Sequence, residues 1–185
     1  MPVVTAGEQE TDETTALALA ARAGDPVAQA AFVRATQAEV WRFTAALVDS
    51  GAADDLTQET FLRVFRALDS FEGRSTVRTW LLGIARRTCA DHLRAVVRRR
   101  KLDARLAAQA ATEVPVPDPA HRLSSADLLN RLGEERRTAF VLTQVLGLSY
   151  AEAAEVEAVP VGTIRSRVAR ARDELITAVS KAQAS

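Results

Sequence analysis

The segment PVGTIRSRVARARDEL, residues 160–175, combines an apolar stripe with a basic face at the spacing of an α-helix. At about 3.6 residues per turn, one side carries Ile164, Val168, Ala171 and Leu175. The opposite side carries polar, basic and small residues: Thr163, Arg165, Ser166, Ala169 and Arg170. The pattern predicts a helix that packs through its apolar stripe and leaves its basic face outside.

The residues before this helix predict a short partner helix. Ser149 and Glu152 have the spacing of a capping box, and the following stretch AEAAEVE (151–157) is rich in alanine, so that another helix can pack closely against it. A short helix, a tight turn and a longer helix describe a helix-turn-helix, whose second helix enters the DNA major groove. We therefore expect DNA contacts from Thr163, Arg165, Ser166, Arg167, Ala169, Arg170 and Arg172.

A simpler interpretation of the same segment is an amphipathic helix that faces water. Its arginines would then pair with nearby acids such as Glu155, Asp173 and Glu174. The capping box, the small-residue helix and the turn together favour the DNA-binding interpretation.

The composition favours helices over sheets. Of the 185 residues, 48% are hydrophobic but only 5% are aromatic, so the core must consist mainly of Ala, Leu and Val. Cys89 is the single cysteine, which excludes an intramolecular disulfide and fits a reducing compartment. The sequence has neither a membrane-spanning apolar run nor a signal-peptide pattern. We expect a cytoplasmic protein with no membrane insertion.

Helical periodicity and a proline-rich interruption divide the chain into two parts. Residues 1–13 are acidic and aperiodic, so we expect a disordered tail there. A first helical domain is expected at 14–101, and Ser75 is the expected N-cap of its last helix. The stretch QAATEVPVPDPAHR (109–122) falls within an expected flexible linker at 102–123. A second domain at 124–181 contains the helix-turn-helix. The expected fold is all-α, with two small helical domains.

Two long segments resemble a known family and occur in the family's order. They are ADDLTQETFLRVFRALDSFEGRSTVRTWLLGIARRTCADHLR (53–94) and LTQVLGLSYAEAAEVEAVPVGTIRSRVARARDEL (142–175). Both are similar to bacterial extracytoplasmic-function (ECF) sigma factors, the small promoter-recognition subunits of RNA polymerase. The resemblance implies that the first domain is sigma region 2, which binds core polymerase and the −10 promoter element and helps to open the strands. It implies that the second is region 4, which binds the −35 element.

The resemblance also implies a polymerase-binding surface in DLTQETFLRVF (55–65), which in the family binds the clamp helices of the largest polymerase subunit. On a helical projection, Phe61, Val64, Phe65 and Leu68 face inward. The expected contact residues are Asp55, Gln58, Glu59, Leu62, Arg63 and Arg66. Without the resemblance, the simpler interpretation is an ordinary hydrated face with one exposed leucine.

The loop FEGRSTVRTW (71–80) and the following helix are implied to bind the −10 region, where the family holds a base flipped from the melted DNA. Trp80 is an expected pocket wall, although burial in the core is the simpler role for a tryptophan. The family often has asparagine where this chain has Arg87, which leaves the preferred base open. The expected contact residues are Phe71, Gly73, Arg74, Ser75, Arg86, Arg87, Arg94 and Arg98.

Other functional classes receive little support from the sequence. We find no nucleotide-binding glycine loop and no nucleophile–base pair, so we expect no enzyme, no catalytic residue and no cofactor. Cys89 and His92 have the spacing of half a metal site, but a small buried thiol is the better interpretation.

Two questions about partners stay open. A stand-alone helix-turn-helix regulator with a helical dimerisation or ligand domain is the alternative function, and it would bind duplex DNA by itself. The resemblance further implies an anti-sigma factor as a possible partner, because many relatives are held inactive in that way.

Overall fold

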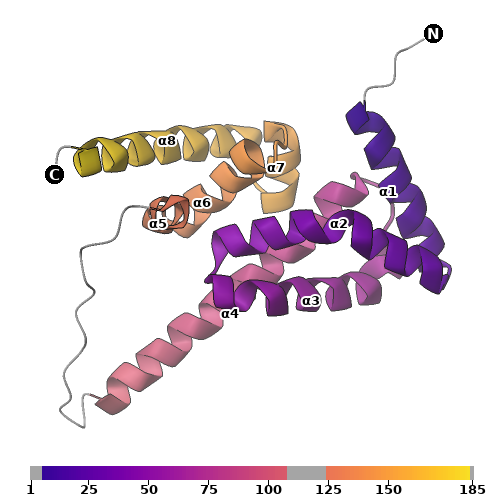
Figure 1. Ribbon diagram of the computed structural model, residues 1–185, viewed down its shortest axis with the longest axis horizontal. Helices are drawn as coiled ribbons and strands as arrows, with labels where there is room; N and C mark the ends of the chain where they lie inside the picture. Colours follow the sequence, from indigo (N-terminus) through magenta and orange to yellow (C-terminus); the bar gives the residue numbers. More distant parts are fainter. Residues whose placement is uncertain (1–5, 108–123, 184–185) are drawn as a thin grey trace.

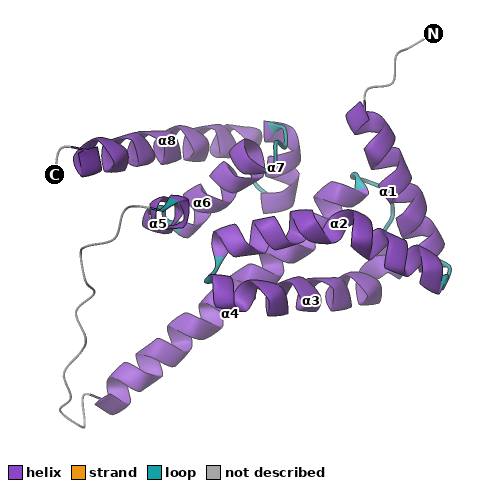
Figure 2. Ribbon diagram, viewed as in Figure 1, coloured by secondary structure: helices purple, strands orange, loops and turns teal. Residues whose placement is uncertain are grey.

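The computed structural model describes residues 6–107 and 124–183, which form helices joined by short turns (Figures 1 and 2). The first unit contains α1 (Ala6–Arg22), α2 (Pro26–Leu47), α3 (Ser50–Ala67), a 3-10 turn (Leu68–Ser70) and α4 (Val77–Ala107). The second contains α5 (Ser125–Arg131), α6 (Glu134–Phe140), a π-helical turn (Val141–Val145), α7 (Tyr150–Glu157) and α8 (Val161–Gln183). No strand occurs within these described ranges, and the expected all-α fold is confirmed.

Local side-chain caps explain where two long helices begin. Asp25 accepts a hydrogen bond from the backbone N–H of Val27, and Pro26 follows it in the first turn of α2. Before α4, the hydroxyl of Thr76 accepts a hydrogen bond from the backbone N–H of Thr79 at 3.1 Å. The cap of α4 is therefore Thr76, and the expected cap Ser75 lies just before it.

Two helices are longer than the sequence pattern indicated. α1 begins at Ala6, so residues 6–13 are helical where we expected a tail. α4 continues to Ala107, into the expected linker, because residues 101–107 (KLDARLA) are mostly strong helix formers. The remaining expected linker, residues 108–123, and residues 1–5 lie outside the described residues.

Side chains from all four helices fill the core of the first unit. Phe32 of α2 and Phe61 of α3 meet edge to face, with ring centroids 6.5 Å apart. Phe43, Leu81 and Leu82 are completely buried. α4 packs against α2 and α3 and runs behind them in Figure 1. This packing fixes the outer faces of α3 and α4 relative to one another.

The second unit is built around the apolar stripe of α8. Ile164, Val168 and Ala171 are completely buried, as the periodicity predicted, whereas Leu175 is only partly buried. α6 and α7 both pack against this helix. Leu142 and Ala153, from the π-helical turn and α7, complete the core without exposed surface.

The two units pack against each other, chiefly through α4 and α7 (Figure 1). Arg78 of α4 donates hydrogen bonds to Glu39 of its own unit and to the backbone oxygen of Leu146, at 2.7 Å, in the other unit. Arg137 of α6 donates to the backbone oxygen of Leu47 at the end of α2, at 3.2 Å. Arginines therefore bridge the boundary from both sides. Among the described residues, no helix is both long and apolar enough to cross a membrane.

Candidate nucleic-acid interface

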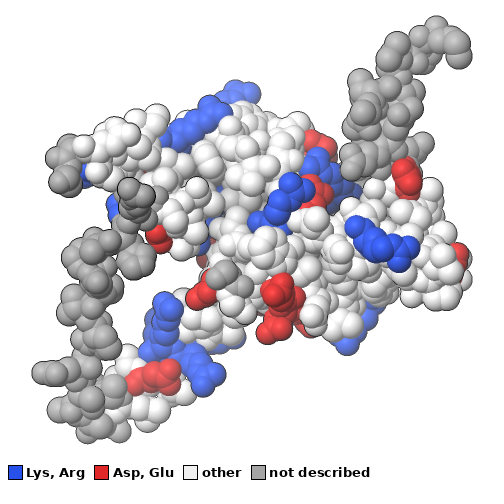
Figure 3. Space-filling view, in the orientation of Figure 1, with Lys and Arg blue, Asp and Glu red and all other residues white. Residues whose placement is uncertain are grey.

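The outer face of α8 is available for a partner. Arg165, Ser166, Ala169 and Arg170 are exposed, and Thr163 is partly exposed. Basic side chains are visible over α8 at the upper edge of the molecule in Figure 3. A face of this kind, with the opposite face buried, can supply guanidinium groups to base edges and phosphates in a major groove.

Two other arginines of α8 are engaged with the protein itself. Arg167 is 15% exposed and donates to Glu157 at 2.6 Å and to Glu135 at 2.8 Å. Arg172 is exposed, and its guanidinium donates to the side-chain oxygen of Gln144 at 2.7 Å. The structure thus separates Arg167, which points into the second unit, from the arginines that face outward.

The turn between α7 and α8 is tightly defined. Ser149 and Glu152 form the expected capping box at the start of α7, with both reciprocal hydrogen bonds present. Ala158 ends α7 in the left-handed conformation, with a φ of 54°. The backbone N–H of Val159 then bonds to the oxygen of Ala154 at 3.0 Å, as in a Schellman-type end. The short helix, the turn and the long helix form the predicted helix-turn-helix.

The outer face of α3 carries the residues expected to bind polymerase. Asp55, Gln58 and Arg66 are exposed, Leu62 is 53% exposed, and Glu59 is partly buried. Arg63 is held from both sides: it donates to Glu59 at 2.8 Å and to Asp91 of α4 at 2.7 Å. An exposed leucine among polar groups fits a protein-docking surface with a small apolar centre.

A hollow lies between the outer faces of α3 and α4, with a volume of about 480 Å³. Trp80, which is partly buried, lines this hollow together with Arg63, Arg87, Asp91 and Arg94. Asp91 accepts hydrogen bonds from Arg63 and Arg94, and these contacts lower its pKa below the ordinary value. The hollow therefore combines an aromatic surface with cationic side chains, a combination suited to an unstacked base and its phosphate.

The loop before α4 shapes one end of this region. Phe71 is buried, and its ring centroid lies 5.1 Å from that of Trp80 at a tilt of 53°. Gly73 has a φ of 69°, so the bend uses a conformation that favours glycine. Arg74 is exposed and pairs with Glu72, and Ser75 is partly exposed. The loop exposes polar groups, whereas Phe71, which we expected to contact DNA, is buried in the core.

The predicted DNA-binding arginines of α4 divide into two groups. Arg87, Arg94 and Arg98 are exposed. The Nε–H of Arg87 donates a hydrogen bond to the backbone oxygen of Gly83 at 3.1 Å. Figure 3 shows further basic side chains over the C-terminal half of α4. Arg86 is partly buried and lines a cavity against the second unit. Sequence periodicity alone did not distinguish these two directions.

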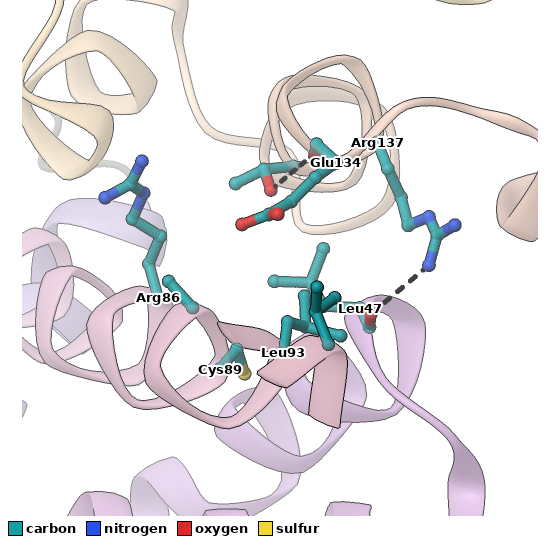
Figure 4. A pocket seen from close by; sticks show the side chains of 9 residues that line it. Leu47, Arg86, Cys89, Leu93, Glu134 and Arg137 are labelled. Atoms are coloured by element: carbon teal, nitrogen blue, oxygen red, sulfur yellow. Dashed lines mark hydrogen bonds between the residues drawn. The ribbon is translucent and has the colours of Figure 1, made fainter. Parts of the chain in front are cut away.

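Arg86 lines a cavity of about 190 Å³ between the two units (Figure 4). Cys89 and Leu93 of α4, Leu47 of α2, and Glu134 and Arg137 of α6 also line it. Burial raises the pKa of the Cys89 thiol to about 12, with a smaller contribution from Glu134. Cys89 is therefore a buried, protonated thiol. Among the described residues, no cluster of three or more His, Cys, Asp or Glu side chains forms a metal site.

Glu157 is a residue that the sequence patterns missed. It ends α7, and its side chain is completely buried although it belongs to a charged residue type. Burial raises its pKa to about 7, against the opposing attraction of Arg167 and then Arg86. The sequence signal that could have identified it is a charged residue among the apolar residues at the end of the alanine-rich segment 151–157.

Comparisons with known proteins match both units. A family model described as Sigma-70 region 2 matches residues 27–100, and one described as Sigma-70, region 4 matches residues 125–175. The chain is 49% identical over 179 residues to the ECF RNA polymerase sigma factor SigC of Mycobacterium tuberculosis (strain CDC 1551 / Oshkosh). That match covers 94% of this chain and 95% of the relative.

Solved structures give a similar result. The sigma factor RpoE in complex with the anti-sigma factor NepR from Bartonella quintana has a TM-score of 0.62 at 27% identity, covering 80% of this chain and 94% of that one. CnrH in complex with the cytosolic domain of CnrY has a TM-score of 0.68 at 23% identity, covering 91% of this chain and 97% of that one. The second likeness supports the fold.

Proposed function

The chain belongs to the ECF family of RNA polymerase sigma factors, and we propose that its two helical units divide promoter recognition between the faces described above. It is a transcription initiation factor that binds DNA and RNA polymerase. The observation that carries the division of labour is the pairing of a matched family region with an exposed polar or basic face in each unit. The stand-alone regulator is not favoured, because the first unit matches sigma region 2.

Reading of the −35 element is assigned to α8. Thr163, Arg165, Ser166, Ala169 and Arg170 form the face that enters the major groove, since the buried stripe fixes their outward direction. Arg172 lies at the edge of this face and reaches a phosphate when it releases Gln144. Guanidinium groups at these positions suit guanine edges and phosphates.

Reading and opening of the −10 region are assigned to the hollow between α3 and α4. Trp80 offers a ring for an unstacked base, and Arg87, Arg94 and Arg98 offer positive charge for the strand. The loop at 71–76 lies beside it, with Gly73, Arg74 and Ser75 accessible and Phe71 supporting it from the core. Arg86 joins this surface once the second unit moves away from α4.

Binding of core polymerase is assigned to the outer face of α3. Leu62 supplies an apolar centre, and Asp55, Gln58, Glu59, Arg63 and Arg66 supply the polar surroundings. Because Arg63 also holds Asp91, this face lies directly beside the −10 hollow. The polymerase performs the chemistry of RNA synthesis, and no catalytic role is assigned to this chain.

The packing of the two units requires a rearrangement on the promoter. The −35 and −10 elements lie about 25 base pairs apart, which is about 85 Å of B-form DNA. In the structure α4 and α7 are in direct contact. We propose that the units separate when both elements are bound. The Bartonella relative is solved with an anti-sigma factor, and a protein of that class is the regulator that we propose for this chain in the cytoplasm.

The experiment that tests this function is transcription in vitro with purified core polymerase and a library of promoters. The proposal predicts initiation from promoters with a −35 and a −10 element, and only when core polymerase is present. Specific binding of the isolated chain to palindromic duplex DNA, as a dimer, together with no promoter-directed transcript, would support the stand-alone regulator instead.

A further inference from the structure

We propose that Glu157 is a positioning residue, which acts through Arg167 to hold the recognition helix α8 in its DNA-reading orientation. The inference rests on the proposed function, because it concerns how the −35 element is read. It changes the expected role of Arg167: the side chain serves the protein instead of contacting DNA.

The first observation is a buried ion pair that joins α7 and α8, with a further contact to Glu135 of α6, whose side chain is 72% exposed. Arg167 of α8 donates through Nη1 to Glu157 of α7 at 2.6 Å and through Nη2 to Glu135 of α6 at 2.8 Å. Glu157 is completely buried and Arg167 is 15% exposed. The guanidinium group is planar and presents its donors in a fixed fork, so two carboxylates on two helices restrict how far α8 can rotate.

The second observation is the place of the pair within the helix-turn-helix. Glu157 is the last residue of α7, and Arg167 lies in the second turn of α8. α7 and α8 are therefore linked twice: by the backbone turn at Ala158 and Val159, and by the Glu157–Arg167 ion pair. Because Ser166 and Arg170 lie on the same helix, a rotation of α8 about its axis would move the whole reading face.

The third observation is that the two carboxylate oxygens of Glu157 differ in their hydrogen bonding. One carboxylate oxygen is bonded to Arg167, whereas none of the described residues gives the buried Oε1 a hydrogen bond. Arg86 of α4 acts on this carboxyl electrostatically from the other unit, and Glu134 and Glu135 of α6 oppose its charge. When α4 moves away on the promoter, Arg167 is the cation that remains beside Glu157.

The physical consequence is asymmetric. Removal of one member of a buried ion pair leaves an uncompensated charge, whereas replacement of both members by apolar residues of similar size is often tolerated. The variants Arg167→Met, Glu157→Leu and their combination therefore separate a positioning role from direct DNA contact. Direct contact would be lost equally in Arg167→Met and in the double variant.

The test is initiation by the holoenzyme at pH 8, from a promoter with an intact −35 element. Arg167→Met is expected to lower initiation about tenfold or more, and the double variant to recover to within about threefold of the wild type. The matched control is Arg170→Met on the same helix, which Glu157→Leu should not rescue, because Arg170 faces DNA. A double variant as defective as Arg167→Met overturns the proposal.

A second template separates positioning from loss of folding. On DNA that is already open around −10 and lacks a −35 element, all these variants should initiate like the wild type. Loss of activity of Arg167→Met on that template would contradict the proposal, since the defect would then lie outside −35 reading. Failure of the wild-type chain to initiate on either template would instead count against the proposed function itself.

The pH dependence provides a further readout. Burial raises the pKa of Glu157 to about 7, in the presence of Arg167, Arg86, Glu134 and Glu135. Without Arg167 the carboxyl can avoid an unpaired charge by taking up a proton. The defect of Arg167→Met, relative to wild type at the same pH, should therefore be smaller at pH 6 than at pH 8. An equal defect at both pH values contradicts the role assigned to Glu157.

Discussion

Helices α8 and α4 both carry several arginines, but the two helices differ in how their charged faces are used. On α8 the buried stripe leaves one outward face, and Arg165 and Arg170 lie on it. On α4 the arginines point in two directions: Arg87 and Arg94 border an open hollow, while Arg86 faces the second unit. The comparison shows that helical periodicity separates core from surface, but it does not tell which surface meets another part of the same chain.

The largest effect tests the apolar stripe of α8. Ile164 is completely buried, so Ile164→Ala should lower the free energy of unfolding of the second unit by about 2 to 5 kcal/mol. Ile176, on the same helix, is 65% exposed, and Ile176→Ala should change it by less than about 0.5 kcal/mol. Urea unfolding followed by helical circular dichroism measures both. Equal effects at the two positions would show that the stripe is not a core face.

The next effect tests the buried carboxyl group of Glu157 at the end of α7. The folded chain keeps a proton on Glu157 up to about pH 7, whereas the unfolded chain releases it near the ordinary value of 4.5. The resulting stability is fully present below pH 4.5 and is lost as the pH rises through 7. The stability of the wild type relative to Glu157→Gln should thus fall by about 2 to 3 kcal/mol between pH 4.5 and 8. A difference that does not vary with pH rejects this environment for Glu157.

A smaller effect tests the contact between the units. Arg137 donates hydrogen bonds to backbone oxygens of Leu47, Asn130 and Leu132, so Arg137→Met should cost about 1 to 3 kcal/mol. It should also expose Cys89, whose buried thiol lines the same cavity. The rate of Cys89 modification by a thiol reagent at pH 8 should rise relative to wild type. Arg131→Met, at an exposed position, is the control; an unchanged rate in Arg137→Met would argue against opening at this boundary.

The smallest effect on stability concerns the exposed half of α4. Arg98 is exposed, so Arg98→Ala should change the unfolding free energy by less than about 0.5 kcal/mol. If it contacts a phosphate, the slope of log affinity against log salt for promoter binding by the holoenzyme should decrease in magnitude by about 1. An unchanged slope would remove Arg98 from the DNA-binding surface.

The sequence predicted much of the architecture because the relevant signals are local. The stripe Ile164–Val168–Ala171, the capping box at Ser149 and the proline-rich break each depend on neighbouring residues, and the all-α fold follows from them. Helix boundaries were predicted less well. We placed the start of the linker at residue 102 from a change in composition, but α4 continues to Ala107 because residues 101–107 favour a helix. The family resemblance, now confirmed, identified the function that periodicity alone could not.

The rest depended on contacts between residues far apart in the chain. Arg167 lies three residues after Ile164 and four before Ala171, so its spacing places it beside the buried stripe. Only the structure shows that it bonds to the buried carboxylate of Glu157. Arg63 was expected on the polymerase face, but its bond to Asp91 also ties it to α4. Arg86 and Arg87 are neighbours in sequence, and the packing of α7 on α4 gives them different surroundings. Such pairings arise from tertiary structure, which a single sequence does not display.

The most direct test of the account is a footprint of promoter DNA with this chain, with and without core polymerase. We predict protection of two segments, around −35 and −10, about 25 base pairs apart, that appears only in the presence of core polymerase. Arg170→Met should weaken the −35 segment and Arg94→Met the −10 segment. A single continuous footprint produced by the chain alone, or loss of both segments from either substitution, would contradict the division of promoter reading between α8 and the α3–α4 hollow.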